Sequence, residues 1–239
     1  MTGQDKQKIY DLLKKASSSL LGYTAKDFSS TIPDFADDIE EAPSETKKEK
    51  TTLSSIAEKV SSCTNCPLGK TRTNSVTGEG VEKPLVLVVG EGPGEDEDKT
   101  GRPFVGKAGQ LLDKMLIAIG LSRNKNCYIA NIVKCRPPHN RTPERQEAEA
   151  CIGYLKAQIK ILKPKMILAL GRTASQNLLQ TEEGVTSLHG KFFDYSGIPI
   201  MTTYHPSALL RDESKKRPAW EDLKSFKIRL TQLCPDYDK

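Results

Sequence analysis

The sequence lacks the features that are typical of integral membrane proteins, of collagen and of small disulfide-rich proteins. Its 239 residues contain no apolar run near the roughly 18–20 residues that cross a bilayer, and the mean hydropathy is −0.50. The N-terminus has no apolar leader followed by a cleavage site, so we expect no secretory signal and a cytoplasmic protein. Six cysteines are too few for a disulfide scaffold in a chain of this length. They require another explanation, which is metal binding, catalysis or burial.

Charge is unevenly distributed along the chain. Residues 1–58 have a net charge of −3, whereas residues 59–239 have a net charge of +8. A basic region is typical of proteins that bind a polyanion such as nucleic acid, although many basic domains bind none. We expect residues 1–54 to form a short helix (within 1–23) and a flexible acidic linker, and residues 55–239 to form one folded domain.

Strands and helices are predicted to alternate from about residue 53. Buried strands are predicted at 85–89, 127–133 and 166–170, and a strand pair at 192–195 and 198–204. Helices are predicted at 106–120, 143–162 (with Thr142 as the N-cap), from 171 to 179, and at 218–233. This alternation indicates an α/β fold with a mainly parallel sheet. In such sheets, functional loops follow the carboxyl ends of the strands, here residues 90–104, 131–141 and 205–211.

A glycine-rich loop follows the first predicted strand. Residues 90–94 (Gly-Glu-Gly-Pro-Gly) predict a tight turn, and four acids follow them. The spacing differs from that of the dinucleotide-binding fingerprint. This leaves an ordinary strand-to-helix connection or a loop whose carboxylates orient water. Further on, Phe104 lies in a second loop, where it is either a buried anchor or a surface on which a base stacks.

The loop at 205–211 (His-Pro-Ser-Ala-Leu-Leu-Arg) combines unusual residues for a strand end. His205 is one of only three histidines, and we expect both Leu209 and Leu210 to be exposed beside Arg211. An exposed leucine next to basic residues is typical of a wedge that enters a DNA groove. The alternative is an ordinary polar surface loop.

Four cysteines form two pairs. Cys63 and Cys66 have C-x-x-C spacing, and Cys135 and Cys151 are predicted at a strand end and on a helix. Four thiolates can hold zinc or an iron–sulfur cluster, and spacing alone does not select between them. Cys127 and Cys234 are better explained by packing.

These segments, in this order, resemble the family-four, iron–sulfur-containing uracil-DNA glycosylases of bacteria and archaea. The resemblance covers about residues 55–232 and leaves residues 1–54 outside it. It rests on the four cysteines and on the segments GEGPGEDED (90–98), GRPFVGKAGQLL (101–112), NIVKCRPP (131–138), LALG (168–171) and HPSALL (205–210).

The resemblance implies a three-layer α/β/α sandwich with a central four-stranded, mainly parallel sheet. It also implies a structural [4Fe–4S] cluster, with these ligands: Cys63, Cys66, Cys135 and Cys151. The implied activity releases uracil from single- or double-stranded DNA and leaves an abasic site. We expect a monomer whose partner is uracil-containing DNA, with no membrane association, and the sequence identifies no partner for residues 1–54.

The same resemblance assigns roles around a uracil that has been flipped out of the base stack. Phe104 stacks on the base, and Asn131 reads its Watson–Crick edge with one amide donor and one acceptor. Glu97 matches the wall that excludes the methyl group of thymine, and Glu91 matches the group that positions the attacking water. His205 is the expected donor to O2 of the departing uracil anion.

The DNA contact is expected along the 205–211 loop. Leu209 fills the gap left by the flipped base, and its neighbours Pro206, Ser207 and Arg211 contact the DNA. Some relatives trap uracil-DNA covalently through a basic, histidine-containing insertion after the second strand. Here the loop at 136–141 is short and lacks that insertion. This predicts ordinary turnover without a covalent adduct. A catalytically silent DNA-binding module and a zinc-stabilised nucleotide-binding protein are the alternative functions.

Overall fold

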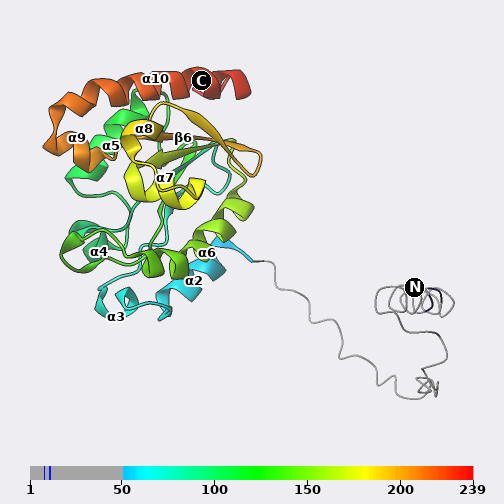
Figure 1. The fold of residues 1–239 in the computed structure, drawn as a ribbon, viewed down its shortest axis with the longest axis vertical. Helices are drawn as coiled ribbons and strands as arrows, with labels where there is room; N and C mark the ends of the chain where they lie inside the picture. Colours follow the sequence, from blue (N-terminus) through cyan, green and yellow to red (C-terminus); the bar gives the residue numbers. More distant parts are fainter. Residues whose placement is uncertain (1–7, 9–10, 12–50, 239) are drawn as a thin grey trace, which may run out of the picture. The chain divides into compact units, whose positions relative to one another are not determined.

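The computed structural model describes Lys8, Asp11 and residues 51–238 (Figure 1). Contacts divide the chain into Met1–Glu49 and Lys50–Lys239, and the second unit contains the sheet and the helices that pack on it. Apart from Lys8 and Asp11, the predicted N-terminal helix and acidic linker lie outside the described residues. Within the described part, no helix has both the length and the apolar character needed to span a bilayer.

A six-stranded sheet with the order β1-β3-β2-β4-β6-β5 forms the centre of the fold. Four neighbouring strands are parallel, as predicted: β3 (Cys127–Asn131), β2 (Val86–Gly90), β4 (Met166–Leu170) and β6 (Ile198–Thr203). Antiparallel edge strands β1 (Glu79–Gly80) and β5 (Phe192–Tyr195) extend the sheet, so the expectation of four strands is wrong by two. Strand β5 is the predicted hairpin partner of β6. Strand β1 has only two residues, too few for an apolar pattern.

Helices cover both faces of the sheet and complete the predicted three-layer sandwich (Figure 1). Strand residues alternate between the two faces, so that Leu87 packs in one core cluster and Val88 in the other. The first cluster includes residues of α6 (Arg145–Leu162) and α7 (Gly171–Leu179). The second includes residues of α5 (Lys107–Ile117) and α10 (Lys216–Leu233).

Shorter elements surround this sandwich. They are α2 (Leu53–Ser61), α3 (Leu68–Thr71), α4 (Glu95–Thr100), η1 (Pro138–Asn140), α8 (Val185–Leu188), α9 (Pro206–Arg211) and η2 (Glu213–Lys215). Helix α6 begins two residues later than predicted. Its N-cap is Glu144 rather than Thr142, because the Glu147 carboxylate accepts the backbone N–H of Glu144 at 2.8 Å and closes the first turn there.

The topology brings four loops to one edge of the sheet. Strand β2 lies beside β3, and α5, which follows β2, packs on one face of the sheet, whereas α6, which follows β3, packs on the other. The loops therefore diverge at this point, where open α/β sheets bind ligands. The segments after β2, β3, β4 and β6 all begin at this edge.

Candidate active site

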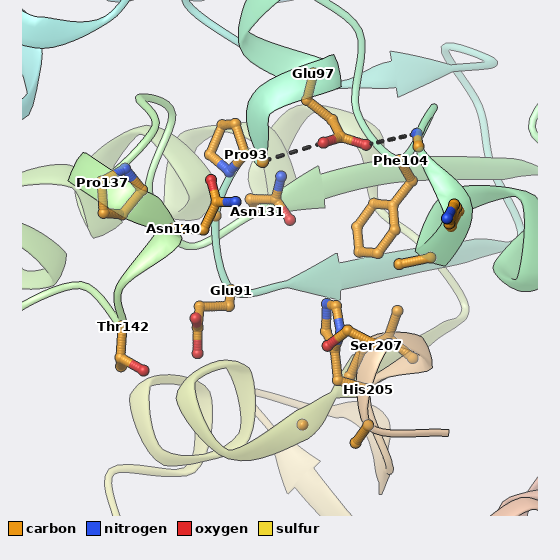
Figure 2. Close-up of a pocket in the computed structure, with 18 of the residues that line it drawn as sticks. Glu91, Pro93, Glu97, Phe104, Asn131, Pro137, Asn140, Thr142, His205 and Ser207 are labelled. Carbon is orange, nitrogen blue, oxygen red and sulfur yellow. Dashed lines mark hydrogen bonds between the residues drawn. The ribbon is translucent and has the colours of Figure 1, made fainter. Parts of the chain in front are cut away.

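A cavity of about 610 Å³ opens at the carboxyl ends of the parallel strands (Figure 2). Seven residues predicted from the sequence line it: Glu91, Glu97, Phe104, Asn131, His205, Ser207 and Arg211. Two other predicted residues, Pro206 and Leu209, are buried and do not line it. Residues from four separate segments thus converge, and their predicted roles in uracil binding and catalysis stay predictions.

Phe104 is fixed in an unusual backbone conformation. Its φ of 53° lies in the left-handed region, which costs a non-glycine residue on the order of 1–3 kcal/mol. Buried Arg123 donates to the carbonyl oxygens of Pro103 and Phe104 at 2.8 and 2.9 Å. On the other side, Glu97 accepts the backbone N–H groups of Val105 and Gly106 at 2.8 and 3.0 Å. The surrounding hydrogen bonds therefore hold the ring at the cavity wall.

Asn131 ends strand β3 with its amide in the cavity wall. The side chain is 1% exposed, and Oδ1 has no hydrogen-bond partner within the described residues. An unpaired buried acceptor is rare because burial removes its water. A Cβ on Gly90 would lie 2.5 Å from both Oδ1 of Asn131 and the ring of Phe104. Gly90 is therefore required for the amide and the ring to approach each other.

His205 is neutral and has a defined tautomer. Its Nδ1 accepts the backbone N–H of Ser207 at 3.2 Å and lies 2.8 Å from the Ser207 hydroxyl. Since Nδ1 is an acceptor, the ring proton is on Nε2. Burial, with a smaller contribution from the charge of Arg211, lowers the pKa of His205 to about 4. The imidazole ring lies 5.5 Å from that of Phe104, centroid to centroid, and Figure 2 shows both at the same cavity.

The two candidate carboxylates differ in their partners. Glu91 follows β2, lines the cavity and accepts a hydrogen bond from the hydroxyl of Thr173 on α7. Glu97 also lines the cavity, but its hydrogen bonds go to backbone N–H groups, including that of Gly94 at 3.1 Å. Glu97 therefore connects two loops of the site, while its predicted steric role stays a prediction.

The expectation that both leucines of the 205–211 loop are exposed is wrong for Leu209. Leu209 is 2% exposed and packs with Tyr204 and Ala219, whereas Leu210 is 49% exposed. The reason is that residues 206–211 form a short helix, α9, with one face against the core. Leu210 is the exposed leucine of this loop, and the predicted contact of Leu209 with DNA stays a prediction.

The four predicted cysteine ligands line a second, small cavity away from the first. It lies between the α2–α3 segment, the residues after β3, and α6. Arg72 donates to Sγ of Cys135 at 3.0 Å, and burial raises the pKa of the Cys151 thiol to about 11. In the part of the chain that the structure describes, no three His, Cys, Asp or Glu residues are grouped closely enough for a single metal ion. Cys127 is buried in β3, and Cys234 follows α10.

Sequence reasoning missed several cavity residues. Tyr204, Lys107 and Arg172 also line the cavity, and Thr173 reaches it through Glu91. Arg172 and Thr173 directly follow Gly171 at the end of β4. Their position after a parallel strand is a signal that could have identified them.

Comparison with known proteins agrees with this architecture. The family model of the uracil DNA glycosylase superfamily matches residues 77–224. The chain is 47% identical over 176 residues to a type-4 uracil-DNA glycosylase of Thermotoga maritima, covering 72% of this chain and 91% of the relative. It is 44% identical over 182 residues to a type-4 uracil-DNA glycosylase of Pyrobaculum aerophilum (73% and 92% covered). It is 43% identical over 192 residues to one of Sulfurisphaera tokodaii (77% and 86% covered). The chain therefore belongs to the uracil-DNA glycosylase superfamily and, within it, to the type-4 uracil-DNA glycosylases.

Proposed function

We propose that this protein is a DNA repair glycosylase that flips uracil out of DNA and hydrolyses its N-glycosidic bond. The observation that carries the proposal is the unpaired, buried Oδ1 of Asn131 beside the neutral imidazole of His205 and the ring of Phe104. A buried acceptor without a partner indicates a ligand that donates a hydrogen bond at that point. The N3–H of uracil is such a donor.

Recognition of the base follows from donor and acceptor chemistry. Oδ1 of Asn131 accepts from N3–H of uracil, and its amide N–H donates to O4. Cytosine presents the opposite pattern at these two positions, so the same amide rejects it. The ring of Phe104 supplies a stacking surface, which contributes roughly 1–3 kcal/mol per base in nucleic-acid complexes.

Bond cleavage leaves a positively charged sugar and a uracil anion. His205 donates its Nε2 proton in a hydrogen bond to O2 of that anion, and no proton transfer is required. A preorganised donor of this kind typically contributes about 10²–10³ in rate. The attacking water is positioned by the carboxylate of Glu91, whose orientation is fixed by the hydroxyl of Thr173. Glu97 holds the loop that carries Phe104 and forms part of the wall against a methyl group.

DNA is bound by the exposed edge of the cavity. The exposed side chain of Leu210 fills the gap left by the flipped base, and partial unstacking costs a few kcal/mol. Cations at the rim bind the phosphates: Lys107, Arg172 and Arg211 line the cavity and form no ion pair with a described carboxylate. Arg141, by contrast, is paired with Glu147 at 2.7 Å.

The cofactor of the proposal is a [4Fe–4S] cluster. Its ligands are the residues that share the second cavity: Cys63, Cys66, Cys135 and Cys151. In a cluster each cysteine binds a different iron, which agrees better with this cavity than a single ion, whose ligands must meet at one point. When bound, the cluster supplies structure, because it joins the α2–α3 segment to α6 and to the end of β3.

A uracil-excision assay with a single-uracil oligonucleotide tests the function. The wild type forms an abasic site, while Asn131→Ala and His205→Ala each lower single-turnover activity by about 10²–10³-fold. Cys234→Ala, outside both cavities, is the matched control and keeps the wild-type rate. A chain that binds the oligonucleotide without cleaving the bond is a silent binding module, and full activity in both variants refutes the assigned residues.

A further inference from the structure

Lys134 is a fully buried lysine between the uracil pocket and the four-cysteine cavity. Its side chain is 0% exposed, and it lines the cysteine cavity. Its Nζ donates to the backbone oxygen of Asn131 at 2.9 Å and to Oε1 of Gln158 at 2.7 Å. One side chain therefore connects the residue that reads uracil with the cavity of the proposed cluster.

The partners of this ammonium group are neutral. Among the described residues, Nζ forms no ion pair with a carboxylate, and its two hydrogen-bond acceptors are an amide oxygen and a backbone oxygen. Burial of an ammonium without an anion costs several kcal/mol, so such groups are normally paired. The structure thus contains a buried positive charge whose anion is not a carboxylate of the described chain.

The cysteine cavity has the charge pattern expected around such an anion. Lys134 and Cys151 both line this cavity, and the positive charge of Lys134 acts on the Cys151 thiol. From the opposite side, the guanidinium of Arg72 donates to Sγ of Cys135 at 3.0 Å. The described residues that line the cavity include these two cations and no carboxylate. This charge pattern fits an anionic occupant.

We propose that Lys134 is the buried counter-charge of the iron–sulfur cluster and, through its bond to Asn131, a positioning residue for uracil recognition. The proposal rests on the function and cofactor proposed above. Four thiolates carry more negative charge than the iron–sulfur core carries positive charge, so the filled site is anionic. Lys134 obtains its missing anion only in the filled site, and it then connects that site to Asn131.

Two variants separate the counter-charge from the positioning role. Lys134→Met removes the charge and the bond to Asn131 together. Gln158→Glu keeps the side chain at 158 nearly the same shape but places a carboxylate beside Nζ, so the lysine charge is neutralised by a neighbour. Lys156→Met, an exposed residue on the same helix as Gln158, is the control that removes one charge without touching either cavity.

The measurements are the midpoint potential of the cluster, by spectroelectrochemical titration, and the rate of iron release to a chelator. Loss of a positive charge beside the cluster disfavours an added electron, so Lys134→Met and Gln158→Glu shift the potential downward. Substitutions next to metal ligands typically cost 10- to 100-fold in metal affinity, so we expect both variants to release iron faster by about that factor. Lys156→Met matches the wild type in both measurements.

Uracil excision provides the second readout. Lys134→Met raises KM for uracil-DNA more than it lowers kcat, because the bond that orients Asn131 is lost. Gln158→Glu keeps that bond and a KM close to that of the wild type. If Lys134→Met does not fold, Gln158→Glu alone decides the counter-charge role.

An unchanged potential and release rate in Gln158→Glu would overturn the counter-charge, and an unchanged KM in a folded Lys134→Met would overturn the positioning role. An iron-free wild type that still excises uracil would also overturn this inference, while leaving the proposed glycosylase activity intact.

Discussion

The two cavities of this molecule differ in how complete they are. In the proposed uracil pocket, the described chain supplies the partners that fix each orienting group: Arg123 and Glu97 hold the Phe104 loop, and Ser207 fixes the tautomer of His205. Among the buried side-chain atoms of the described residues that line this cavity, Oδ1 of Asn131 alone has no hydrogen-bond partner. The cysteine cavity contains buried thiols and a buried lysine without an anion.

The first cavity is preorganised by the chain itself, whereas the cysteine cavity depends on a bound group in the proposed function. A pocket whose walls are held by hydrogen bonds keeps its shape before the ligand arrives, which is the condition for electrostatic catalysis. In the proposed function, the cysteine cavity would gain its full stability only with the cluster bound, so cluster binding and folding would be coupled there. Variants in the two cavities should therefore fail in different ways.

The largest expected effect is on the cysteine cavity. The double variant Cys63→Ala/Cys66→Ala removes half of the proposed ligands, and we expect it to purify without iron or labile sulfide. Because the occupant joins α2 and α3 to the rest of the domain, residues 53–71 should become sensitive to limited proteolysis. Iron analysis and mass spectrometry of the fragments check both results.

Cys234→Ala is the control for this experiment, since Cys234 lies outside the cavity, and it should retain iron and resist the protease. A double variant with wild-type iron content would show that other residues hold the metal, and it would remove the proposed contrast between the cavities.

The second effect is a pH dependence that belongs to the uracil pocket. The pKa of His205 is lowered from its ordinary value of 6.5 to about 4 in the folded state. The unfolded chain binds a proton below pH 6.5 but the folded chain does so only near pH 4. The contribution of His205 to the free energy of unfolding is therefore complete above pH 6.5. It decreases as the pH falls toward 4, by about 3 kcal/mol in total.

Chemical denaturation at several pH values measures this difference against His205→Gln. The variant lacks the titrating group, so its free energy of unfolding should fall less between pH 6.5 and 4. Other groups titrate equally in both proteins and cancel in the comparison. Parallel curves for the two proteins would mean that His205 has an ordinary pKa and a solvated ring.

The third effect is steric and confined to the pocket. Gly90→Ala places a Cβ 2.5 Å from both the Asn131 amide and the Phe104 ring, so one or both must move. Displacements of about 1 Å in a catalytic site cost about 100-fold in rate. We expect a loss of that size in kcat/KM for uracil-DNA, with iron content unchanged.

Gly153→Ala is the matched control, because Gly153 lies within α6 and a Cβ there meets no atom within 4 Å. It should keep full activity and gain up to about 1 kcal/mol of stability. If Gly90→Ala retained wild-type activity, the pocket would be more adaptable than its hydrogen bonds indicate.

The sequence was sufficient to predict much of this architecture. The apolar runs located β2 and β4 to within one residue, and the rule that sites follow parallel strands identified the loops of Glu91, Asn131 and His205. These features are local, so a single chain displays them. The position of Phe104 in a loop singled it out as either a buried anchor or a stacking surface, and the family resemblance added the predicted stacking role.

Features that depend on three-dimensional packing were missed. Strand β1 has two residues and exists only because β3 is beside it. Lys134 directly follows the apolar run at 127–133, where a lysine is ordinarily expected to be as exposed as Lys125. The error at Leu209 has the same origin, since a turn of helix too short to recognise decides which of two adjacent leucines is buried.

The smallest expected effect tests that last correction. Leu210→Ala should leave stability nearly unchanged, because the side chain is exposed, and should lower kcat/KM on duplex uracil-DNA by about fivefold, or ~1 kcal/mol. On single-stranded DNA, where less stacking must be broken, the loss should be smaller. Leu209→Ala instead should cost about 2–5 kcal/mol of stability as a buried truncation, with similar losses of activity on both substrates. If Leu209→Ala alone produced the duplex-specific defect, α9 would have to rearrange on DNA, and the loop would not share the preorganisation of the rest of the pocket.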